Sequence, residues 1–592
     1  MKGHPTKKRN KYVWILLFVF VLFLIYLFKF KKDDVRDELN IVREHLRHYR
    51  DELRARHRSE QLEHHEEIAE LKQQNEELLD HHHEEIAELK QQNEELLDHH
   101  EQHHEEIAEL KQQNEELLDH HEQHHKELSN PNVQKINENS KDKTGDEQHH
   151  KELSNPNVQK IDQKINENSK DKTGDEIRAG MQHAFQAYIR DAWKSDEYKP
   201  VSKHGVNTFG GKGLTIIDSL DTLWLMGLND EYTQAKEFVE HEFKFSGHIN
   251  VFENNIRVLG GLLSVYTLTE EQIFLDKARE VGEVLLGAFR HRIPCGIIDT
   301  NGYCGSQSWA GGRSVNAEVG TLSLEFETLS HLTGDSRWSE KIKGINEYWR
   351  EQNHGLLQMY IDPKTEKMSG PQTIGGGIDS TYEYLIKLKI MNGDELAGEL
   401  YERFEREIVE NMLVTHGTHT FAKASGSNRL EHLGCFGGGM LILGKRYIKE
   451  GLAFAETCAE MYTSTASGLA CDSVTIEPNG TIKCENDIYL LRPEAVESIF
   501  YAWRQTHDQK WRDYARKIWK ALQKHCEVLT GGFTDVKYVT RPTPEKMDKQ
   551  ESWFLAETLK YLWLTFQSDD VVPLEHYVFN TEAHPFQISK FI

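Results

Sequence analysis

The C-terminal part of the chain repeats one pattern, in which a helical segment with an acidic residue returns about every 60 residues. The steps between successive segments are 65, 61, 58, 57 and 63 residues, and the segments lie around Glu253, Glu318, Asp379, Gly437, Glu494 and Glu557. The segment at Gly437 lacks the acidic residue but is Gly-rich and helical in character. Because such a step holds two helices with their connections, the pattern predicts an α/α toroid whose inner helices face a central cavity.

Apolar spacing supports this all-α fold class from Ile177 onward. Ile256, Leu259, Leu263 and Tyr266 follow one another at i, i+3, i+7 and i+10, as on one face of a helix. Few segments alternate as strands do, although short hairpins are expected near the Gly-rich stretches. We therefore expect residues 177–592 to form one helical barrel.

Composition separates this domain from the preceding part of the 592-residue chain. Of the 33 His residues, 19 precede residue 177, whereas all 7 Cys and 10 of the 11 Trp follow it. The net charge of −26 argues against a nucleic-acid partner, because nucleic-acid binding requires clustered Lys and Arg.

Residues 12–28 contain no charged side chain and are almost wholly aliphatic or aromatic. The preceding residues 1–11 carry several Lys and Arg, which favours a cytoplasmic N-terminus. A cleaved signal peptide would have small residues after the apolar run, whereas Lys29 and Phe30 follow it here. The sequence predicts an uncleaved transmembrane signal-anchor at 12–28 behind a cytoplasmic tail at 1–11; a buried core helix is the alternative.

Residues 33–176 are repetitive and predict a stem. The block EEIAELKQQNEELLDHH occurs three times with apolar residues at heptad a and d positions, which favours a coiled coil and allows a homodimer. Pro131 and Pro156 end the helical pattern and begin a flexible, polar linker. The His pairs permit metal binding or pH sensing, but a solvated spacer is the simpler interpretation.

Three pairs of carboxylates lie one helical turn apart: Asp218 and Asp221, Asp379 and Glu383, and Glu494 and Glu497. One such pair is ordinarily a solvated acidic face, because like charges on one helix face repel each other. These pairs, however, lie within apolar or aromatic runs such as DSLDTLWLM and LRPEAVESIF. Converging in one cavity, they would suit a hard cation with oxygen ligands or a sugar held through its hydroxyl groups.

Eight motifs occur in an order and spacing that resemble the class I α-mannosidases, glycoside hydrolase family 47. They are LTIIDSLDTLWLMGL from Leu214, VFENNIRVLGGLLSVY from Val251, AEVGTLSLEF from Ala317, DSTYEYLIK from Asp379, HLGCF from His432, LRPEAVES from Leu491, FLAETLKYLWL from Phe554 and YVFNTEAHP from Tyr577. The resemblance covers essentially all of residues 177–592.

The resemblance implies an (αα)7 barrel in which a C-terminal hairpin plugs one end. It also implies inverting hydrolysis of terminal α-1,2-linked mannose on oligomannose N-glycans, the substrate that would be this protein's partner. One calcium ion is implied at the barrel floor, held by the carbonyl and hydroxyl oxygens of Thr581.

The same resemblance implies roles for individual residues. Glu253 would be the general acid and Glu494 the general base, while Asp379 would be a third essential carboxylate and an alternative acid. Arg257 would pair with Glu253 or with the sugar. The residues expected to hold water or sugar are Asp218, Glu383, Glu497, Glu557, Glu582 and Trp553, the last at a position where the family usually has Phe and where it would stack beneath the sugar ring.

Cysteine positions add one expected disulfide. Cys435 and Cys458 match the family's characteristic bridge. Five further cysteines remain, of which Cys295 and Cys304 either close a short loop or stay free. Asn479 begins the one glycosylation sequon that we find.

Two departures from the family bear on specificity and location. Asp472 replaces a glycan-binding Glu with a shorter side chain, and Gly377 lies where endoplasmic-reticulum members have Arg. The missing Arg predicts broader trimming of several mannoses in the Golgi membrane, with the endoplasmic reticulum as the alternative location.

Two other functions are compatible with such a fold. A quality-control factor would bind glycans of misfolded glycoproteins and hydrolyse slowly or not at all, and a structural tether would carry an inert barrel. The retained Glu253, Asp379, Glu494 and Thr581 favour the enzyme over both.

Overall fold

The computed structural model describes residues 171–352, 355–423 and 426–588. The expected anchor at 12–28 and nearly all of the stem at 33–176 lie outside these residues, so their prediction stays open. Within the described ranges, no helix combines the length and apolar character needed to cross a membrane. The first described helix, α4 (Thr173–Ala192), begins four residues before the expected boundary at 177.

Helices of an inner and an outer layer alternate along the chain. The outer layer contains α4, α6 (Asn229–His241), α9 (Gln272–Leu285), α12 (Arg337–Glu351), α14 (Glu395–Asn411), α16 (Ile448–Thr463) and α18 (Gln509–His525). The inner layer contains α5 (Leu214–Leu225), α8 (Gly260–Thr269), α11 (Ser323–Thr333), α13 (Asp379–Asn392), α15 (Phe436–Leu443), α17 (Glu494–Thr506) and α19 (Leu559–Phe566).

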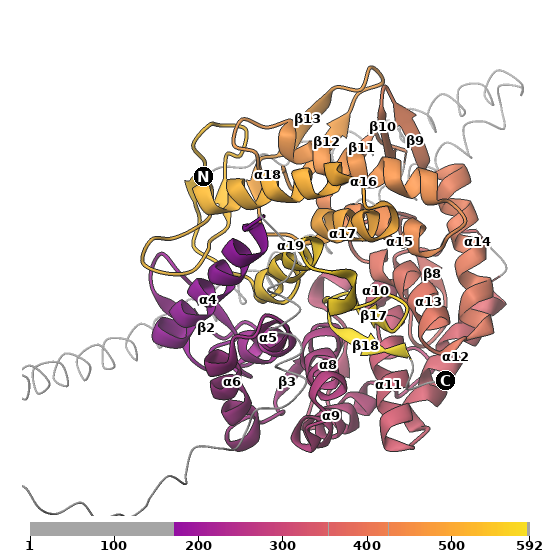
Figure 1. Ribbon diagram of the computed structural model, residues 1–592. Coiled ribbons are helices and arrows are strands. Elements are labelled where there is room, and N and C mark those ends of the chain that lie inside the picture. Colours follow the sequence, from indigo (N-terminus) through magenta and orange to yellow (C-terminus); the bar gives the residue numbers. More distant parts are fainter. Residues whose placement is uncertain (1–170, 353–354, 424–425, 589–592) are drawn as a thin grey trace, which may run out of the picture. The chain divides into compact units, whose positions relative to one another are not determined.

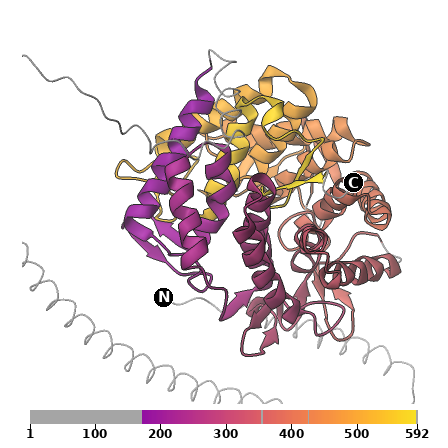
Figure 2. The same ribbon diagram turned by 60° about the horizontal axis from the view of Figure 1, so that its bottom comes forward.

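Short helical segments precede several inner helices. They are α7 (Val251–Glu253) and the π-helical η1 (Asn254–Leu259) before α8, α10 (Asn316–Gly320) before α11, η4 (His432–Cys435) before α15, and the π-helical η5 (Phe554–Thr558) before α19. Each inner helix packs on the next, and η5 packs on α5, so the ring closes (Figures 1 and 2). The predicted all-helical, barrel-like domain is confirmed.

The sequence of each layer explains its position. In α8, GGLLSVYTLT is apolar on all sides, as expected for a helix with protein on both faces. In α18, the buried side chains Trp511, Ile518, Trp519 and Leu522 share one face, while Lys and Arg occupy the other. The outer helices therefore cover the inner ring and present their polar faces to solvent.

Short antiparallel strands join the helices, more of them than the sequence predicted. The small sheets pair β1 (Glu197–Lys199) with β2 (His204–Val206); β3 (His248–Asn250), β4 (Ile297–Asp299) and β5 (Cys304–Gly305); β6 (Ser314–Val315), β7 (Tyr360–Ile361) and β8 (Met368–Ser369); β9 (Leu413–His416) with β10 (His419–Ala422); β11 (Arg429–Glu431), β12 (Ser473–Ile476) and β13 (Ile482–Asn486); and β14 (Ile488–Tyr489), β15 (Val536–Lys537) and β16 (Glu545–Lys546). Strands β3, β6, β11 and β14 each precede the N-terminus of an inner helical segment, so these sheets lie at one mouth of the barrel. Three 3-10 turns complete the connections: η2 (Leu286–Ala288), η3 (Ser308–Ala310) and η6 (Asp569–Val571).

The C-terminal hairpin of β17 (Tyr577–Phe579) and β18 (Pro585–Gln587) enters the ring and packs against α13 and α8 (Figure 1). Phe579 is fully buried, with its ring centroid 5.7 Å from that of Phe500 and 5.5 Å from that of Tyr561. The hairpin therefore fills the barrel, and its tip, residues 580–584, reaches the centre.

Cysteine and glycine residues fix the contacts of α15. The predicted disulfide Cys435–Cys458 is present and joins the start of α15 to α16. A Cβ atom at Gly438 would lie 2.9 Å from the backbone nitrogen of Ala455 and 3.0 Å from the Ser498 hydroxyl, so close helix packing requires glycine there. Two more disulfides are present, Cys295–Cys304 and Cys471–Cys484. Cys295 and Cys304 therefore close a short loop and do not stay free, whereas Cys526 is free and buried.

Candidate active site

The acidic residues that recur along the sequence lie at the N-termini of the inner helical segments. Glu253 is in α7, Glu318 in the first turn of α10, Asp379 at the start of α13, Glu494 at the start of α17 and Glu557 in η5. A helix N-terminus stabilises a negative charge through its free N–H groups. The interval of about 60 residues thus arises because each helix pair returns the chain to the same mouth of the barrel.

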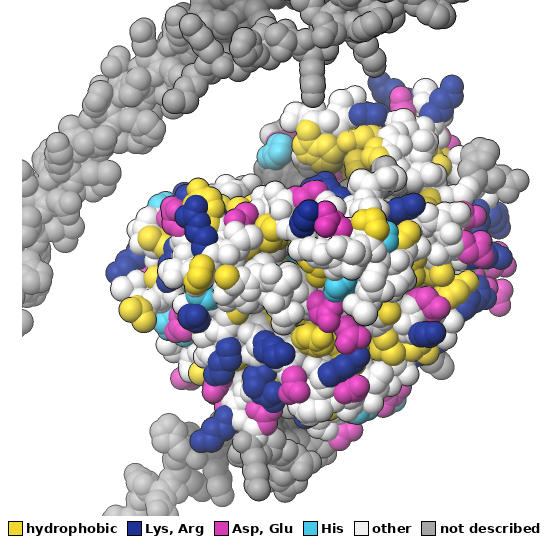
Figure 3. Space-filling view, turned by 90° about the horizontal axis from the view of Figure 1, so that it is seen from above, with side chains coloured by type: hydrophobic (Ala, Val, Ile, Leu, Met, Phe, Trp, Pro, Cys, Tyr) yellow, Lys and Arg dark blue, Asp and Glu magenta, His cyan; other side chains and the backbone are white. Residues whose placement is uncertain are grey.

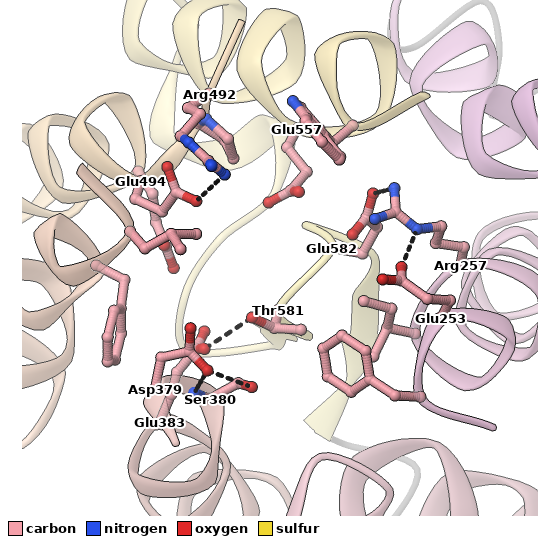
Figure 4. Close-up of a pocket in the computed structure, with 17 residues that line it drawn as sticks. Glu253, Arg257, Asp379, Ser380, Glu383, Arg492, Glu494, Glu557, Thr581 and Glu582 are labelled. Atoms are coloured by element: carbon pink, nitrogen blue, oxygen red, sulfur yellow. Dashed lines mark hydrogen bonds and ion pairs between the residues drawn. The ribbon is translucent and has the colours of Figure 1, made fainter. Parts of the chain in front are cut away.

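One cavity of about 210 Å³, open to solvent, lies between these N-termini and the hairpin tip (Figure 4). Ten of the eleven predicted site residues line it: Glu253, Arg257, Asp379, Glu383, Glu494, Glu497, Trp553, Glu557, Thr581 and Glu582. Phe252, Ile256, Ser380, Leu433, Phe436, Arg492 and Pro493 also line it, and sequence reasoning assigned no role to them. Asp218 is not among its lining residues.

Glu253 and Arg257 form one wall. The side-chain oxygen of Asn250 accepts a hydrogen bond from the backbone N–H of Glu253 at 3.2 Å and so caps the short helix α7. Arg257 Nε donates to the Glu253 carboxylate at 2.9 Å, one turn further on, within the π-helical segment. The π-helical geometry is frequent at functional sites, because it changes which side chains share a face.

Arg257 also organises the surrounding acidic groups. Its Nη1 donates to Glu582 at 2.6 Å and to the Ser552 hydroxyl at 2.9 Å, while its guanidinium carbon lies 5.3 Å from the centroid of the Trp553 ring. Trp553 is fixed in turn by a 3.1 Å hydrogen bond from Nε1 to the carbonyl of Leu490. One buried cation thereby positions two carboxylates and an aromatic ring around the cavity.

Asp218 lies behind this wall, in a buried network, rather than at the cavity surface where the sequence placed it. His584 contacts Asp218 at 3.1 Å through Nε2 and Asp221 at 2.8 Å through Nδ1, and all three side chains are fully buried. Burial opposes the charged form of the imidazole, yet the two carboxylates outweigh burial and raise the pKa of His584. Lys560 donates to Asp221 at 2.9 Å and to the Ala583 carbonyl at 2.7 Å. This network holds the hairpin tip in place.

Asp379 faces the cavity with few compensating groups. The Ser380 backbone N–H donates to its carboxyl at 3.0 Å, and Glu383 and Glu494 lie near it as like charges. Burial, reinforced by these two carboxylates, raises the pKa of Asp379 to about 7. Asp379 is therefore protonated over much of the range in which Glu494, whose pKa is lowered, is charged.

Glu494 has the opposite environment. His432 Nδ1 lies 2.9 Å from its carboxylate and Arg492 Nη1 lies 4.0 Å from it. Burial alone would raise the pKa of Glu494, but the His432 hydrogen bond and the Arg492 charge outweigh it and lower the pKa. His432 is itself held at Nε2 by the hydroxyl of Tyr462 at 2.9 Å. Glu494 is thus an ionised carboxylate in a fixed orientation.

The cavity floor is formed by the hairpin tip. Thr581 Oγ1 donates to Glu383 at 2.9 Å, and the backbone N–H of Thr581 contacts the hydroxyl of Tyr384 at 3.3 Å. Lys387 is fully buried and donates to Glu383. Burial, with nearby like charges, raises the pKa of Glu497 to about 8 and raises those of Glu557 and Glu582 well above the ordinary value. The floor therefore holds more carboxylates than its cations neutralise.

Figure 4 shows how these groups face one another across the cavity. Glu253 and Arg257 lie on one side, Glu494 and Arg492 lie on the other, and Thr581 lies between them. Glu494, which can accept a proton, and Glu253 on the opposite wall are thus separated by a space that a substrate can occupy.

Comparison with known proteins identifies the architecture. The model of Glycosyl hydrolase family 47 matches residues 180–588. The chain belongs to this family. It is 38% identical over 447 residues to the mannosyl-oligosaccharide 1,2-alpha-mannosidase IB of Mus musculus, covering 70% of each chain. It is 39% identical to the mannosyl-oligosaccharide 1,2-alpha-mannosidase IA of Sus scrofa, covering 70% of this chain and 67% of that protein.

Among solved structures, this family 47 chain is similar to an alpha-1,2-mannosidase from Trichoderma reesei, with a TM-score of 0.66 and 28% identity. The match covers 70% of this chain and 99% of that chain. The resemblance inferred from the motifs is confirmed.

The two departures from the family pattern have structural counterparts. Asp472 accepts a hydrogen bond from Arg492 Nε at 2.7 Å and one from Asn486 Nδ2 at 3.1 Å. The shorter side chain therefore supports Arg492, which in turn lies beside Glu494. At Gly377 the backbone has φ +92°, and a Cβ atom there would lie 3.1–3.2 Å from three side-chain atoms of Met359. Met359 occupies the space into which a side chain at position 377 would extend.

The residues that the sequence missed carried usable signals. His432 begins the HLGCF motif and Arg492 stands two residues before Glu494 in LRPEAVES. Neither residue was assigned a role. For His432 the reason is that its partner, Glu494, lies 62 residues away along the chain. A carboxylate expected to act as a base needs a cation or donor nearby, and that requirement would have pointed to both.

Proposed function

We propose that this protein is a class I α-1,2-mannosidase that removes terminal α-1,2-linked mannose from oligomannose N-glycans with inversion of configuration. One observation carries the proposal: an ionised Glu494 and the pair Glu253 and Arg257 occupy opposite walls of one acidic cavity (Figure 4). An inverting glycosidase needs a base and an acid on opposite sides of the scissile bond, with room for a water molecule.

Glu494 is the general base in this proposal. Its lowered pKa keeps it able to take a proton from the attacking water, and His432 and Arg492 fix its orientation. His432 is a positioning residue, because it acts through Glu494 and does not line the cavity.

Asp379 and Glu253 are the two candidates for the general acid. Burial raises the pKa of Asp379 to about 7, so that about half of these carboxyls carry a proton at neutral pH. Glu253 accepts a hydrogen bond from Arg257 Nε, which fixes the orientation of its carboxyl group. We infer that Glu253, on the wall opposite Glu494, supplies the proton to the leaving oxygen, as first expected, and that Asp379 is the alternative acid.

The cavity floor suits the calcium ion that the family implies. Calcium prefers six to eight oxygen ligands, and the floor offers Thr581 with Glu383, Glu497, Glu557 and Glu582 around it. Burial, with neighbouring like charges, raises the pKa of the last three carboxyls, and a cation bound there would favour their charged forms. Within the described residues, the one cluster of three potential side-chain ligands is Cys471, Cys484 and Asp487, and those cysteines are bonded to each other.

We therefore propose Thr581 as the direct protein ligand, with the carboxylates acting through water. When bound, the ion would help to orient sugar hydroxyls and stabilise charge that develops at the cleaved mannose.

The finer expectations belong to the same proposal. We propose an (αα)7 barrel, a type II signal-anchor at 12–28, residence in the Golgi membrane, a stem at 33–176 that permits dimer formation, and glycosylation at the exposed Asn479. Gly377 and Met359 leave the cavity entrance without the Arg of the endoplasmic-reticulum members, which supports removal of several mannoses. The face in Figure 3 mixes Lys and Arg with Asp and Glu, and the proposal includes no nucleic-acid partner.

The test is to incubate the full-length protein with an oligomannose N-glycan, with calcium and after chelation, and to follow product masses over time. Calcium-dependent loss of several hexoses is expected. A single stable product lacking one hexose would keep the enzyme but contradict the broad specificity. Glycan binding without hydrolysis would favour the quality-control factor instead.

A further inference from the structure

Two large aromatic side chains are exposed near the barrel mouth. Both lie between β4 and β6: Tyr303, 55% exposed, in the loop that the disulfide Cys295–Cys304 closes, and Trp309, 60% exposed, in the following turn η3. Tryptophan is largely buried in most folded proteins, so an exposed one is informative. Exposed aromatic surface beside a binding cavity commonly marks a ligand contact.

The local packing holds Trp309 in a defined position. Its ring centroid lies 6.2 Å from that of Tyr360, with an angle of 60° between the rings. Arg313 places its guanidinium carbon 4.0 Å from the centroid of the Tyr360 ring and donates to the Ala310 carbonyl at 2.8 Å and to the Ser369 hydroxyl at 3.1 Å. These contacts hold the segment around Trp309 against the sheet β6–β7–β8.

A small apolar cluster lies beneath these rings. Ala310, Val315 and Ala317 are buried, and Met359 and Tyr360 pack against them. This cluster is separate from the main core and lies where β6 leads into α10. A rigid support of this kind lowers the entropy lost when a ligand stacks on an aromatic ring.

Hydrogen bonds connect this support to the catalytic cavity. The backbone N–H of Asn316 donates to the Met359 carbonyl at 2.8 Å, and that of Ala317 donates to the Gly377 carbonyl at 3.1 Å. Gly377 is two residues before Asp379, which lines the cavity. Tyr360, adjacent to Met359 in the chain, then leads to Trp309.

A second connection runs through Glu318. Gln307, two residues before Trp309, donates from Nε2 to the Glu318 carboxylate at 3.3 Å. Glu318 feels the charge of Glu253 on the cavity wall. The loop of Trp309 is therefore joined to the cavity on the Asp379 side and on the Glu253 side.

We propose that Trp309, backed by Tyr360, is a sugar-stacking platform that binds a mannosyl residue of the substrate glycan outside the catalytic cavity. The inference rests on the proposed function. The C–H face of a mannose ring is apolar and its rim is polar, which suits an aromatic ring that is rigid and half solvated. The cavity receives the terminal mannose, so the platform receives a sugar from another part of the same branched glycan.

The test compares full-length wild type, Trp309→Ala, Trp309→Phe and Tyr303→Ala on two substrates. One substrate is an intact oligomannose N-glycan, and the other is α-1,2-linked mannobiose, which is too short to reach beyond the cavity. Tyr303→Ala is the matched control, since Tyr303 is similarly exposed on the neighbouring loop between β4 and β5. Binding of the intact glycan is measured by calorimetry in parallel, so that each variant is assessed whether or not it hydrolyses.

For Trp309→Ala we expect KM and Kd for the intact glycan to rise by about tenfold, with kcat unchanged. Hydrolysis of the mannobiose stays at the wild-type level, Trp309→Phe recovers most of the binding and Tyr303→Ala behaves as wild type. Equal Kd values for wild type and Trp309→Ala, or an equal loss in Tyr303→Ala, would overturn the platform. If wild type hydrolyses neither substrate, the proposed function fails, and the calorimetric comparison still decides the platform.

Discussion

Two sets of carboxylates in this barrel share a sequence pattern and differ in environment. Asp218 and Asp221 on α5 are one turn apart in an apolar run, as are Glu494 and Glu497 on α17. The α5 pair is fully buried between His584 and Lys560, with Arg257 3.4 Å from Asp218. The α17 pair borders the open cavity.

The difference lies in the compensating cations. Burial opposes ionisation in both places, but His584 lowers the pKa of Asp218 and Lys560 lowers that of Asp221. Glu497 instead keeps a pKa raised to about 8, and Asp379 nearby keeps one of about 7. The compensated α5 carboxylates, away from the cavity, stabilise the fold. At the cavity, His432 and Arg492 keep Glu494 ionised, whereas the uncompensated carboxyls retain protons and binding capacity that substrate or a cation can use.

Replacing the base should give the largest effect. Glu494→Gln preserves size and a polar contact with His432 but removes the proton acceptor, so kcat on oligomannose should fall by about 10³-fold. Steady-state kinetics with product masses measures the loss, and calorimetric glycan binding should stay within about threefold of wild type. Glu399→Gln, at an exposed position on α14, is the control. A decrease in kcat smaller than about tenfold would assign the base elsewhere.

Breaking the compensated pair should instead destabilise the fold. Lys560→Met removes the cation that faces Asp221 in a dry environment, and the expected loss of unfolding free energy is about 3–5 kcal/mol. Chemical denaturation measures it. Lys520→Met, which removes an exposed ion pair with Glu176, should cost at most about 1 kcal/mol. Equal losses in the two variants would show that the Asp221 network contributes no special stability.

The fold was predictable because each helix pair repeats a local sequence pattern that can be recognised without the tertiary structure. Apart from α5, each inner helical segment has near its start an acidic residue or, at α15, glycines that permit close packing. The interval of about 60 residues between these positions is therefore the length of one helix pair. The short strands were underestimated because most contain only two or three residues, too few to show alternation. The motifs also located ten of the residues that line the cavity.

The distinction between the two carboxylate sets was not predictable from spacing. Asp218 was expected at the sugar, but its partner His584 is 366 residues away in the chain and arrives with the hairpin tip. His432 meets Glu494 across 62 residues in the same way. A spacing of three or four residues defines one helix face, and only the tertiary fold decides whether a cation, a donor or open space lies opposite that face.

The smallest expected effect tests whether Asp379 is an uncompensated carboxyl, through the direction in which its replacement changes the free energy of unfolding. Its pKa is raised from the unfolded value to about 7, so the stability that the protonated group allows is fully present below about pH 4 and is lost as pH rises through about 7. Asp379→Asn removes this loss. In calcium-free buffer we expect the variant to be more stable than wild type by about 2 kcal/mol at pH 8 and to match it near pH 4. With calcium present, the variant should lose most of its activity. Denaturation curves at both pH values measure the difference, with Glu399→Gln again as the control. A variant less stable than wild type at pH 8 would mean that Asp379 is a compensated, structural carboxylate like Asp221, and would exclude it as the alternative acid.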